Sequence, residues 1–112
     1  MKIEERYEHG ICVLSVGESR LDASQAPALK DALVQRVEAG QHQLVLDLSQ
    51  TAFMDSSGLG ALVSCLKRLG PRGNMAVVGV SGAVQRLFTL TRMDRVFILE
   101  PDVDAAVARL RG

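Results

Sequence analysis

The stretch FMDSSGLGAL, residues 53–62, places an aspartate, two serines and two glycines where an apolar run gives way to a helical pattern. From Leu59 to Leu69 apolar residues recur every three or four positions, which predicts a helix with one face turned to a core. This core stripe consists of Leu59, Leu62, Val63, Leu66 and Leu69. The opposite side consists of Ser57, Gly60, Ala61, Ser64 and Arg68.

The side of this helix that is turned away from the core consists mainly of small residues. A solvated helix face normally carries long charged side chains, and a glycine inside a helix costs about 1 kcal/mol relative to alanine. The presence of a glycine at position 60 therefore needs an explanation, and the close approach of another protein is one. We expect Gly60, Ala61 and Ser64 to form a docking face for a protein partner, with Ser57 at its edge.

Apolar runs and turn signals on both sides of this helix predict further strands. The predicted strands are Ile3–Glu8, Ile11–Val16, Gln43–Ser49, Met75–Val80 and Arg95–Leu99. The turn at His9 and Gly10 makes the first two strands an antiparallel hairpin. The consecutive apolar residues Leu44–Leu46 are typical of a strand that is covered on both faces.

Four helices are expected between and after these strands. The first is expected to start after a cap at Asp22 or Ser24 and to stop at Gly40. The second follows the quoted stretch and runs through Leu69. The third is expected to start at Ser81, and the fourth at Pro101 and Asp102. The order β-β-α-β-α-β-α-β-α predicts an α/β fold with a mostly parallel sheet of about five strands, an N-terminal hairpin and four helices. At this length we expect one compact domain, residues 1–112.

Composition and charge argue against several classes of function. The chain has 13 basic and 13 acidic residues, no tryptophan and one tyrosine, so neither a basic surface nor a base-stacking platform for nucleic acid is indicated. Cys12 and Cys65 lack metal-ligand spacing, and His9 and His42 are isolated, which predicts buried reduced thiols and no metal site. No segment resembles a membrane span or a signal peptide, so we expect a cytoplasmic protein without direct membrane insertion.

The Asp-Ser-Ser-Gly segment, residues 55–58, can be explained as a simple helix cap or as part of one of several kinds of catalytic site. Asp55 or Ser56 can simply cap the helix. A nucleophile elbow needs glycine two residues before and two after the serine, but Asp55 and Leu59 flank Ser57. A phosphate-binding loop needs a lysine that this turn lacks, and the dinucleotide fingerprint needs a glycine where Val63 stands. We therefore predict that the protein is not an enzyme and has no cofactor.

Ser57 is better suited to receive a phosphate than to attack a substrate. A phosphate adds roughly −1.5 to −2 charges, which a helix N-terminus tolerates through its dipole and free N–H groups. Beside Asp55 and at the edge of a packed contact, the same charge would repel a partner or be buried without compensation. The sequence thus predicts a switch in which the unmodified protein binds its partner and the phosphorylated protein does not.

FMDSSGLGAL resembles the signature of the anti-sigma factor antagonists of the STAS domain class. RLDASQAPALK, residues 20–30, is similar to a second stretch of that family. LDLSQTAFMDSSG, residues 46–58, matches the family in register. With the order of strands and helices, the resemblance covers essentially the whole chain.

The resemblance implies a partner-switching function. In this family an anti-sigma factor that is also a serine kinase holds a sigma factor inactive, and the unphosphorylated antagonist binds that kinase and releases the sigma factor. The kinase, which binds the ATP and Mg²⁺, phosphorylates the antagonist on the second serine of the motif, and a metal-dependent serine phosphatase removes the phosphate. Ser57 is then the phosphoacceptor, Asp55, Ser56 and Gly58 shape the turn, and Asp22 lies in a neighbouring loop.

Two questions stay open at the level of sequence. Asp22 can accept hydrogen bonds from N–H groups near Ser57, contact the kinase, or cap the first helix. The domain class also includes regulators of secretion or biofilm pathways, and constitutive scaffold or transport-complex subunits. An intact acceptor serine favours the switch over the scaffold, because a scaffold needs no such hydroxyl.

Overall fold

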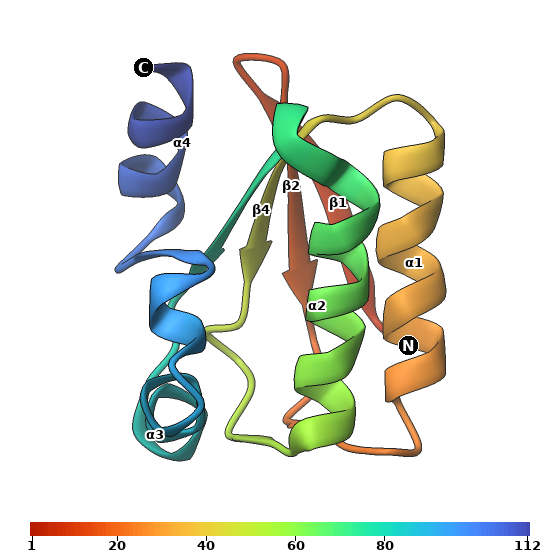
Figure 1. Ribbon diagram of the computed structural model, residues 1–112, viewed down its shortest axis with the longest axis vertical. Coiled ribbons are helices and arrows are strands. Elements are labelled where there is room, and N and C mark those ends of the chain that lie inside the picture. Colours follow the sequence, from red (N-terminus) through yellow and green to blue (C-terminus); the bar gives the residue numbers. More distant parts are fainter.

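The predicted alternation of strands and helices is confirmed in the computed structural model, which describes residues 1–112 (Figure 1). The strands are β1 (Ile3–Glu8), β2 (Ile11–Val16), β3 (Arg20–Leu21), β4 (Gln43–Asp47), β5 (Phe53–Met54), β6 (Asn74–Val78) and β7 (Ile98–Glu100). The helices are α1 (Ala26–Glu38), α2 (Ser56–Leu69), α3 (Gly82–Leu90) and α4 (Val103–Arg111), with single 3-10 turns at Gly70–Arg72 and Met93–Arg95.

Five strands form the main sheet, in the order β1-β2-β4-β6-β7. The hairpin makes β1 antiparallel to β2, with Glu8 opposite Ile11, and every other neighbouring pair is parallel. The hairpin boundaries agree with the prediction at both ends, because a two-residue turn with positive φ at His9 and Gly10 fixes them locally.

The sheet has a core on each face. Successive residues of a strand point to opposite faces, so Leu14 and Leu46 lie in the larger core while Val13 and Val45 lie in the smaller one. The larger core is shared with α1, α2 and α3, and the smaller one with α4. This double burial confirms that the apolar run of β4 belongs to a strand covered on both faces.

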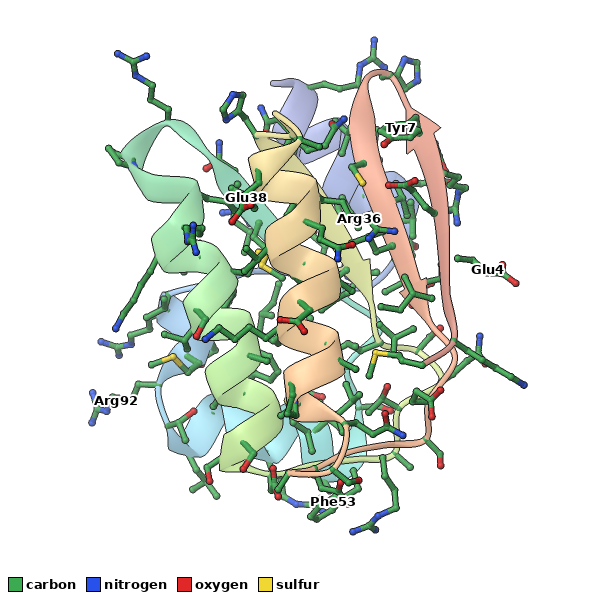
Figure 2. All side chains as sticks on the ribbon, turned by 90° about the vertical axis from the view of Figure 1, so that its right-hand side faces the viewer. Glu4, Tyr7, Arg36, Glu38, Phe53 and Arg92 are labelled. Carbon is green, nitrogen blue, oxygen red and sulfur yellow. The ribbon has the colours of Figure 1, made fainter.

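Helices α1 and α2 lie side by side and run in the same direction, so that their N-termini lie at the same end of the molecule (Figures 1 and 2). Phe53 lies at that end as well, and Arg36 reaches from α1 toward the hairpin (Figure 2). Arg36 forms an ion pair with Glu5 of β1, with 3.1 Å between Nε and Oε2. The segments before α1 and before α2 therefore meet at one end of the fold.

The prediction for the last strand was wrong in its boundaries. Arg95 lies in a 3-10 turn, and the strand begins at Ile98. Phe97 is buried edge-on against Phe88, with 5.8 Å between the ring centroids, and its N–H donates to the carbonyl of Met93. Because this contact holds Phe97 in the turn, pairing with β6 starts one residue later.

The two-residue strands β3 and β5 were not predicted. They form a separate parallel pair, with Arg20 opposite Phe53 and Leu21 opposite Met54. A strand this short shows no periodicity in the sequence, so only the tertiary structure reveals it. The pair matters for function because it ties the segment before α1 to the segment before α2.

Both cysteines are buried and free, as predicted. Burial raises the thiol pKa of Cys12 to about 11, and it raises that of Cys65 to about 11 as well. No helix in the structure has the length and apolar character that crossing a bilayer requires. No group of three or more His, Cys, Asp or Glu side chains is arranged to hold a metal ion.

The thiols are expected to be unreactive in the folded protein. Only the thiolate reacts, and a pKa of about 11 in place of 9.0 leaves about a hundredfold less thiolate at pH 8. Iodoacetamide at pH 8 should therefore label Cys12 and Cys65 at least about tenfold more slowly in the native protein than in guanidinium chloride. Mass spectrometry over time measures this, and equal rates in the two conditions would contradict the burial.

Candidate functional site at the start of helix α2

Helix α2 is capped by Asp55. The backbone of Asp55 is extended, and its Oδ1 accepts hydrogen bonds from the N–H groups of Ser57, at 2.9 Å, and Gly58, at 3.2 Å. Its own carbonyl accepts from the N–H of Leu59 at 3.1 Å. Of the two predicted caps, Asp55 is confirmed, while Ser56 is instead the first residue of the helix.

The two serines differ in their surroundings. Ser56 is exposed, whereas Ser57 is half-buried and lines a groove. The structure gives neither hydroxyl a hydrogen-bond partner within the protein. The nearby Asp55 carboxylate accepts from backbone N–H groups rather than from the Ser57 hydroxyl, so no base is positioned to take the proton of Ser57. The Ser57 hydroxyl is therefore accessible to another protein that could modify it, but it is not activated to attack a substrate itself.

Gly58 lies where the two loops cross. Its position is buried, and a Cβ there would collide with the carbonyl oxygen of Leu21 and lie 3.0 Å from the Cγ of Met54. The N–H of Asp55 also donates to the carbonyl of Leu21, at 3.3 Å. Only glycine allows this approach, which brings the two stretches singled out in the sequence into contact.

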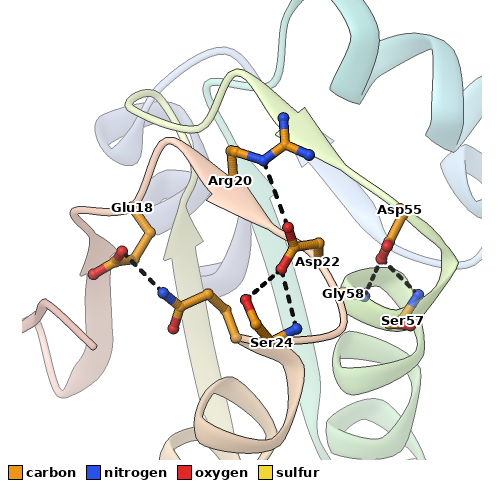
Figure 3. A network of polar contacts seen from close by, with 8 residues as sticks. Glu18, Arg20, Asp22, Ser24, Asp55, Ser57 and Gly58 are labelled. Carbon is orange, nitrogen blue, oxygen red and sulfur yellow. Dashed lines mark hydrogen bonds and ion pairs between the residues drawn. The ribbon is translucent and has the colours of Figure 1, made fainter.

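Asp22 sits in a small polar network beside this crossing (Figure 3). Its Oδ1 accepts from the hydroxyl of Ser24, at 2.6 Å, and from the Ser24 N–H, at 3.0 Å. Its Oδ2 lies 3.5 Å from Nε of Arg20, whose guanidinium also stacks over the ring of Phe53 at 4.3 Å from the centroid. The hydrogen bonds from Ser24, and then Arg20, hold the pKa of Asp22 below its usual value.

The structure separates the three roles that the sequence left open for Asp22. Helix α1 begins at Ala26, and Gln25 at its N-cap position makes no side-chain capping bond. Asp22 caps the turn that leads into this helix, because its carboxylate accepts from the N–H of Ser24 and its carbonyl accepts from the N–H of Ala26. The N–H groups near Ser57 donate to Asp55 rather than to Asp22. Asp22 instead folds the turn that precedes the helix, because its carboxylate closes on Ser24 two residues later.

A groove of about 610 Å³ runs between the first turns of α1 and α2. Helix α2 contributes Ser57, Gly60, Ala61 and Ser64 to its lining. The segment that starts α1 contributes Ala23, Ala26, Pro27, Lys30 and Asp31. The predicted docking residues of α2 are thus brought together, in a hollow between two helices rather than on an open face.

The small residues of α2 were explained from the sequence by the close approach of a partner, and this explanation is needed for only some of them. Ala61 is 4% exposed, since α2 packs beside α1, so a small residue is needed there by this chain itself. Gly60 is exposed, and a Cβ at its position would meet no atom within 4 Å. Gly60 is therefore the position in the groove whose smallness the fold does not explain.

The groove residues on α1 and just before it were not predicted from the sequence. Ala23, Ala26, Pro27, Lys30 and Asp31 recur at intervals of three and four, which was a visible signal of one helix face. The spacing shows that these residues share one face of a helix, but nothing in their chemistry distinguishes that face as a binding surface. Its importance comes from the helix beside it.

Replacing Gly60 with alanine should raise stability. Alanine is favoured over glycine inside a helix by about 0.5–1 kcal/mol, and the added methyl group meets empty space. Urea denaturation should show a free energy of unfolding higher by about that amount. A loss of stability would mean that the fold itself requires glycine at this position.

Comparison with known proteins identifies the family. The family model described as the STAS domain matches residues 2–106. This chain belongs to the STAS domain family. The resemblance of its motifs to the anti-sigma factor antagonists is likewise confirmed by relatives that carry this name.

Three similar proteins place this STAS domain more closely. The anti-sigma-B factor antagonist of Listeria monocytogenes is 36% identical over 98 residues, which cover 86% of this chain and 83% of that protein. The anti-sigma-F factor antagonist RsfB of Mycobacterium tuberculosis is 31% identical over 104 residues, covering 93% and 84%. The crystal structure of an anti-sigma factor antagonist from Mycobacterium paratuberculosis superposes with a TM-score of 0.91 at 32% identity, covering 99% of this chain and 94% of that one.

Proposed function

We propose that this STAS domain is an anti-sigma factor antagonist whose binding is switched off by phosphorylation of Ser57. The observation that carries the proposal is the place of Ser57: a hydroxyl without a partner in the protein, on the first turn of a capped helix, at the end of an open groove. The names of the relatives at 36% and 31% identity support an anti-sigma factor as the binding partner.

In the unmodified state, the groove between α1 and α2 receives part of the anti-sigma factor. Gly60 and Ser64 keep the groove open, and Asp22, the neighbour in sequence of the groove residue Ala23, contacts the partner beside the groove. The surface is small and mostly uncharged, so a partner can pack closely against it. Binding there releases the sigma factor that the anti-sigma factor had held.

In the modification step, the anti-sigma factor acts as a serine kinase in the cytoplasm. Its ATP, with Mg²⁺ bound by the kinase, transfers the γ-phosphoryl group to Oγ of Ser57, while the hydroxyl proton leaves to a base of the kinase and ADP is the leaving group. Asp55 and Gly58 hold Ser57 in register for this transfer by fixing the first turn of α2. A metal-dependent serine phosphatase restores the hydroxyl.

The phosphate switches binding off by its charge. Asp55 stands beside Ser57, and Asp31 lines the same groove together with the single cation Lys30, so the added charge enters a region where carboxylates outnumber ammonium groups. A partner that packs over the groove would have to bury this charge or move away from it. The proposal thus explains a change of affinity without a change of fold.

The phosphoacceptor assignment is tested with a purified anti-sigma factor kinase and ATP. We expect one phosphate per chain on Ser57, located by peptide mass spectrometry, and we expect none in the Ser57→Ala variant. Ser56→Ala is the matched control and should be modified like the parent. Phosphate on Ser56, with Ser57→Ala still fully modified, would overturn the assignment.

The docking groove is tested with Ser64→Arg. The arginine side chain would fill the groove, whereas the buried stripe of α2 is untouched, so the fold should persist. Calorimetry should show affinity for the anti-sigma factor lowered at least about tenfold, or 1.4 kcal/mol, with an unchanged circular dichroism spectrum. Parent-like affinity in a folded Ser64→Arg variant would remove this groove from the interface.

A further inference from the structure

The groove beside Ser57 contains a single cationic side chain, Lys30. The other charged residue that lines the groove is Asp31, which follows Lys30 on α1. Both are exposed, and neither takes part in any of the ion pairs of the protein. Lys30 therefore carries a charge that the fold does not use.

Lys30 and Ser57 line the same groove from two helices. Helices α1 and α2 begin at the same end of the molecule (Figures 1 and 2). By sequence, Lys30 lies one turn into α1, and Ser57 lies in the first turn of α2. Side chains on a helix tilt toward its N-terminus. A side chain at position 30 can therefore extend along the groove toward the N-terminal end at which Ser57 lies.

Helix α2 itself has little to offer a phosphate on Ser57. The N–H groups of Ser57 and Gly58 already donate to the Asp55 carboxylate, and the N–H of Leu59 donates to the Asp55 carbonyl. The cap also places a negative charge at this helix terminus. A phosphate needs a counter-charge from another element, and across the groove that element is α1, whose N-terminus has no side-chain cap and no acidic residue in its first turn.

We propose that the ammonium group of Lys30 holds the phosphate of phosphorylated Ser57 in the groove between α1 and α2. The N–H groups of Lys30 donate to phosphate oxygens in a charge-assisted hydrogen bond. The inference rests on the proposed phosphorylation of Ser57 and extends it. A phosphate held in this way occupies the groove, so it blocks the partner sterically as well as by charge.

The test uses the full chain with phosphoserine incorporated at position 57 during translation, which needs no kinase. The second ionisation of the phosphate, ordinarily near pKa 6, is followed by phosphorus NMR as a function of pH. A nearby cation favours the dianion and lowers this pKa. In Lys30→Gln we therefore expect the phosphate pKa to rise by at least about 0.5 units.

Two variants serve as matched comparisons. Lys67→Gln removes another exposed lysine, on α2, that is ten residues, roughly 15 Å, from position 57, and it should leave the phosphate pKa unchanged. Asp31→Asn removes the anion of the groove and should lower the phosphate pKa. The proposal is overturned if Lys30→Gln shifts the pKa by less than about 0.1 units, or no more than Lys67→Gln does.

The outcome is separable from that of the kinase experiment. If an anti-sigma factor kinase modifies a different residue, the proposed switch at Ser57 fails, but the titration of incorporated phosphoserine still reports whether Lys30 reaches it. If the kinase modifies Ser57 and the titration shows no effect of Lys30, the switch stands and the role of Lys30 falls.

Discussion

Replacing Ser57 with aspartate is expected to weaken binding to the anti-sigma factor kinase by at least roughly tenfold, which corresponds to 1.4 kcal/mol. The carboxylate would stand at the end of the groove, near Asp55 and Asp31, where a docking partner must desolvate it. A charge that the partner itself does not compensate at a packed contact can cost several kcal/mol. Aspartate carries one charge where phosphate carries nearly two, so the true phosphoprotein should bind more weakly still.

Ser57→Ala provides the opposite state. It should bind about as tightly as the parent protein and should keep binding in the presence of ATP, because no hydroxyl is left to modify. Ser56→Asp tests position, since it adds the same charge to the same turn at a residue that does not line the groove. We expect its loss of affinity to be smaller than that of Ser57→Asp.

The measurement is calorimetric titration of each variant into the kinase, with thermal unfolding as a check on the fold. Melting temperatures of the Ser57 variants should differ little, because an acidic residue in the first helical turn is tolerated or mildly favourable. If Ser57→Asp and the phosphorylated protein both bind as tightly as Ser57→Ala, the charge switch is wrong. A constitutive role as a subunit of a larger assembly would then be the better hypothesis.

Replacing Gly58 with alanine is expected to destabilise the protein by about 2 kcal/mol or more, within the range for overpacked sites. The new Cβ would collide with the backbone carbonyl of Leu21, which cannot rotate away as the end of a long side chain could. Relief requires that the segment before α1 move away from α2, which breaks the pairing of Leu21 with Met54. The intrinsic preference of a helix for alanine offsets only about 1 kcal/mol of this cost.

Gly60→Ala is the matched control for Gly58→Ala, since both place one methyl group in the same helix two residues apart. The two variants should change the free energy of unfolding in opposite directions, with Gly60→Ala stabilising and Gly58→Ala destabilising. Urea titration of both measures this. Similar effects of the two substitutions would show that the backbone carbonyl of Leu21 does not lie as close to Gly58 as described.

The elements predicted correctly are those whose signals are local. The hairpin is fixed by a two-residue turn, and β4 by an apolar run that both cores cover. The cap at Asp55 follows from a carboxylate placed two and three residues before the N–H groups that it accepts from. Each of these depends on residues within one turn or one strand, so the sequence contains all that is needed to infer it.

The candidate site could be predicted only in part. The sequence marks Ser57 through its motif, and it marks Gly60 and Ser64 through the unusual smallness of a helix face. It does not show that Ala61 is buried against α1, nor that Asp22 bonds to Ser24 rather than reaching toward Ser57. These facts depend on how two helices lie beside each other, which no local pattern records.

By itself the sequence determined the order of the four helices and of the five strands of the main sheet, the two-sided burial of β4 and the capped start of α2, because local backbone preferences and the spacing of apolar residues suffice for these. The tertiary structure alone decided that Gly58 is required while Gly60 is not, and that Lys30 shares a groove with Ser57. The physical reason is that these properties arise where segments some thirty residues apart cross or pack together, and steric exclusion between them depends on their positions in space.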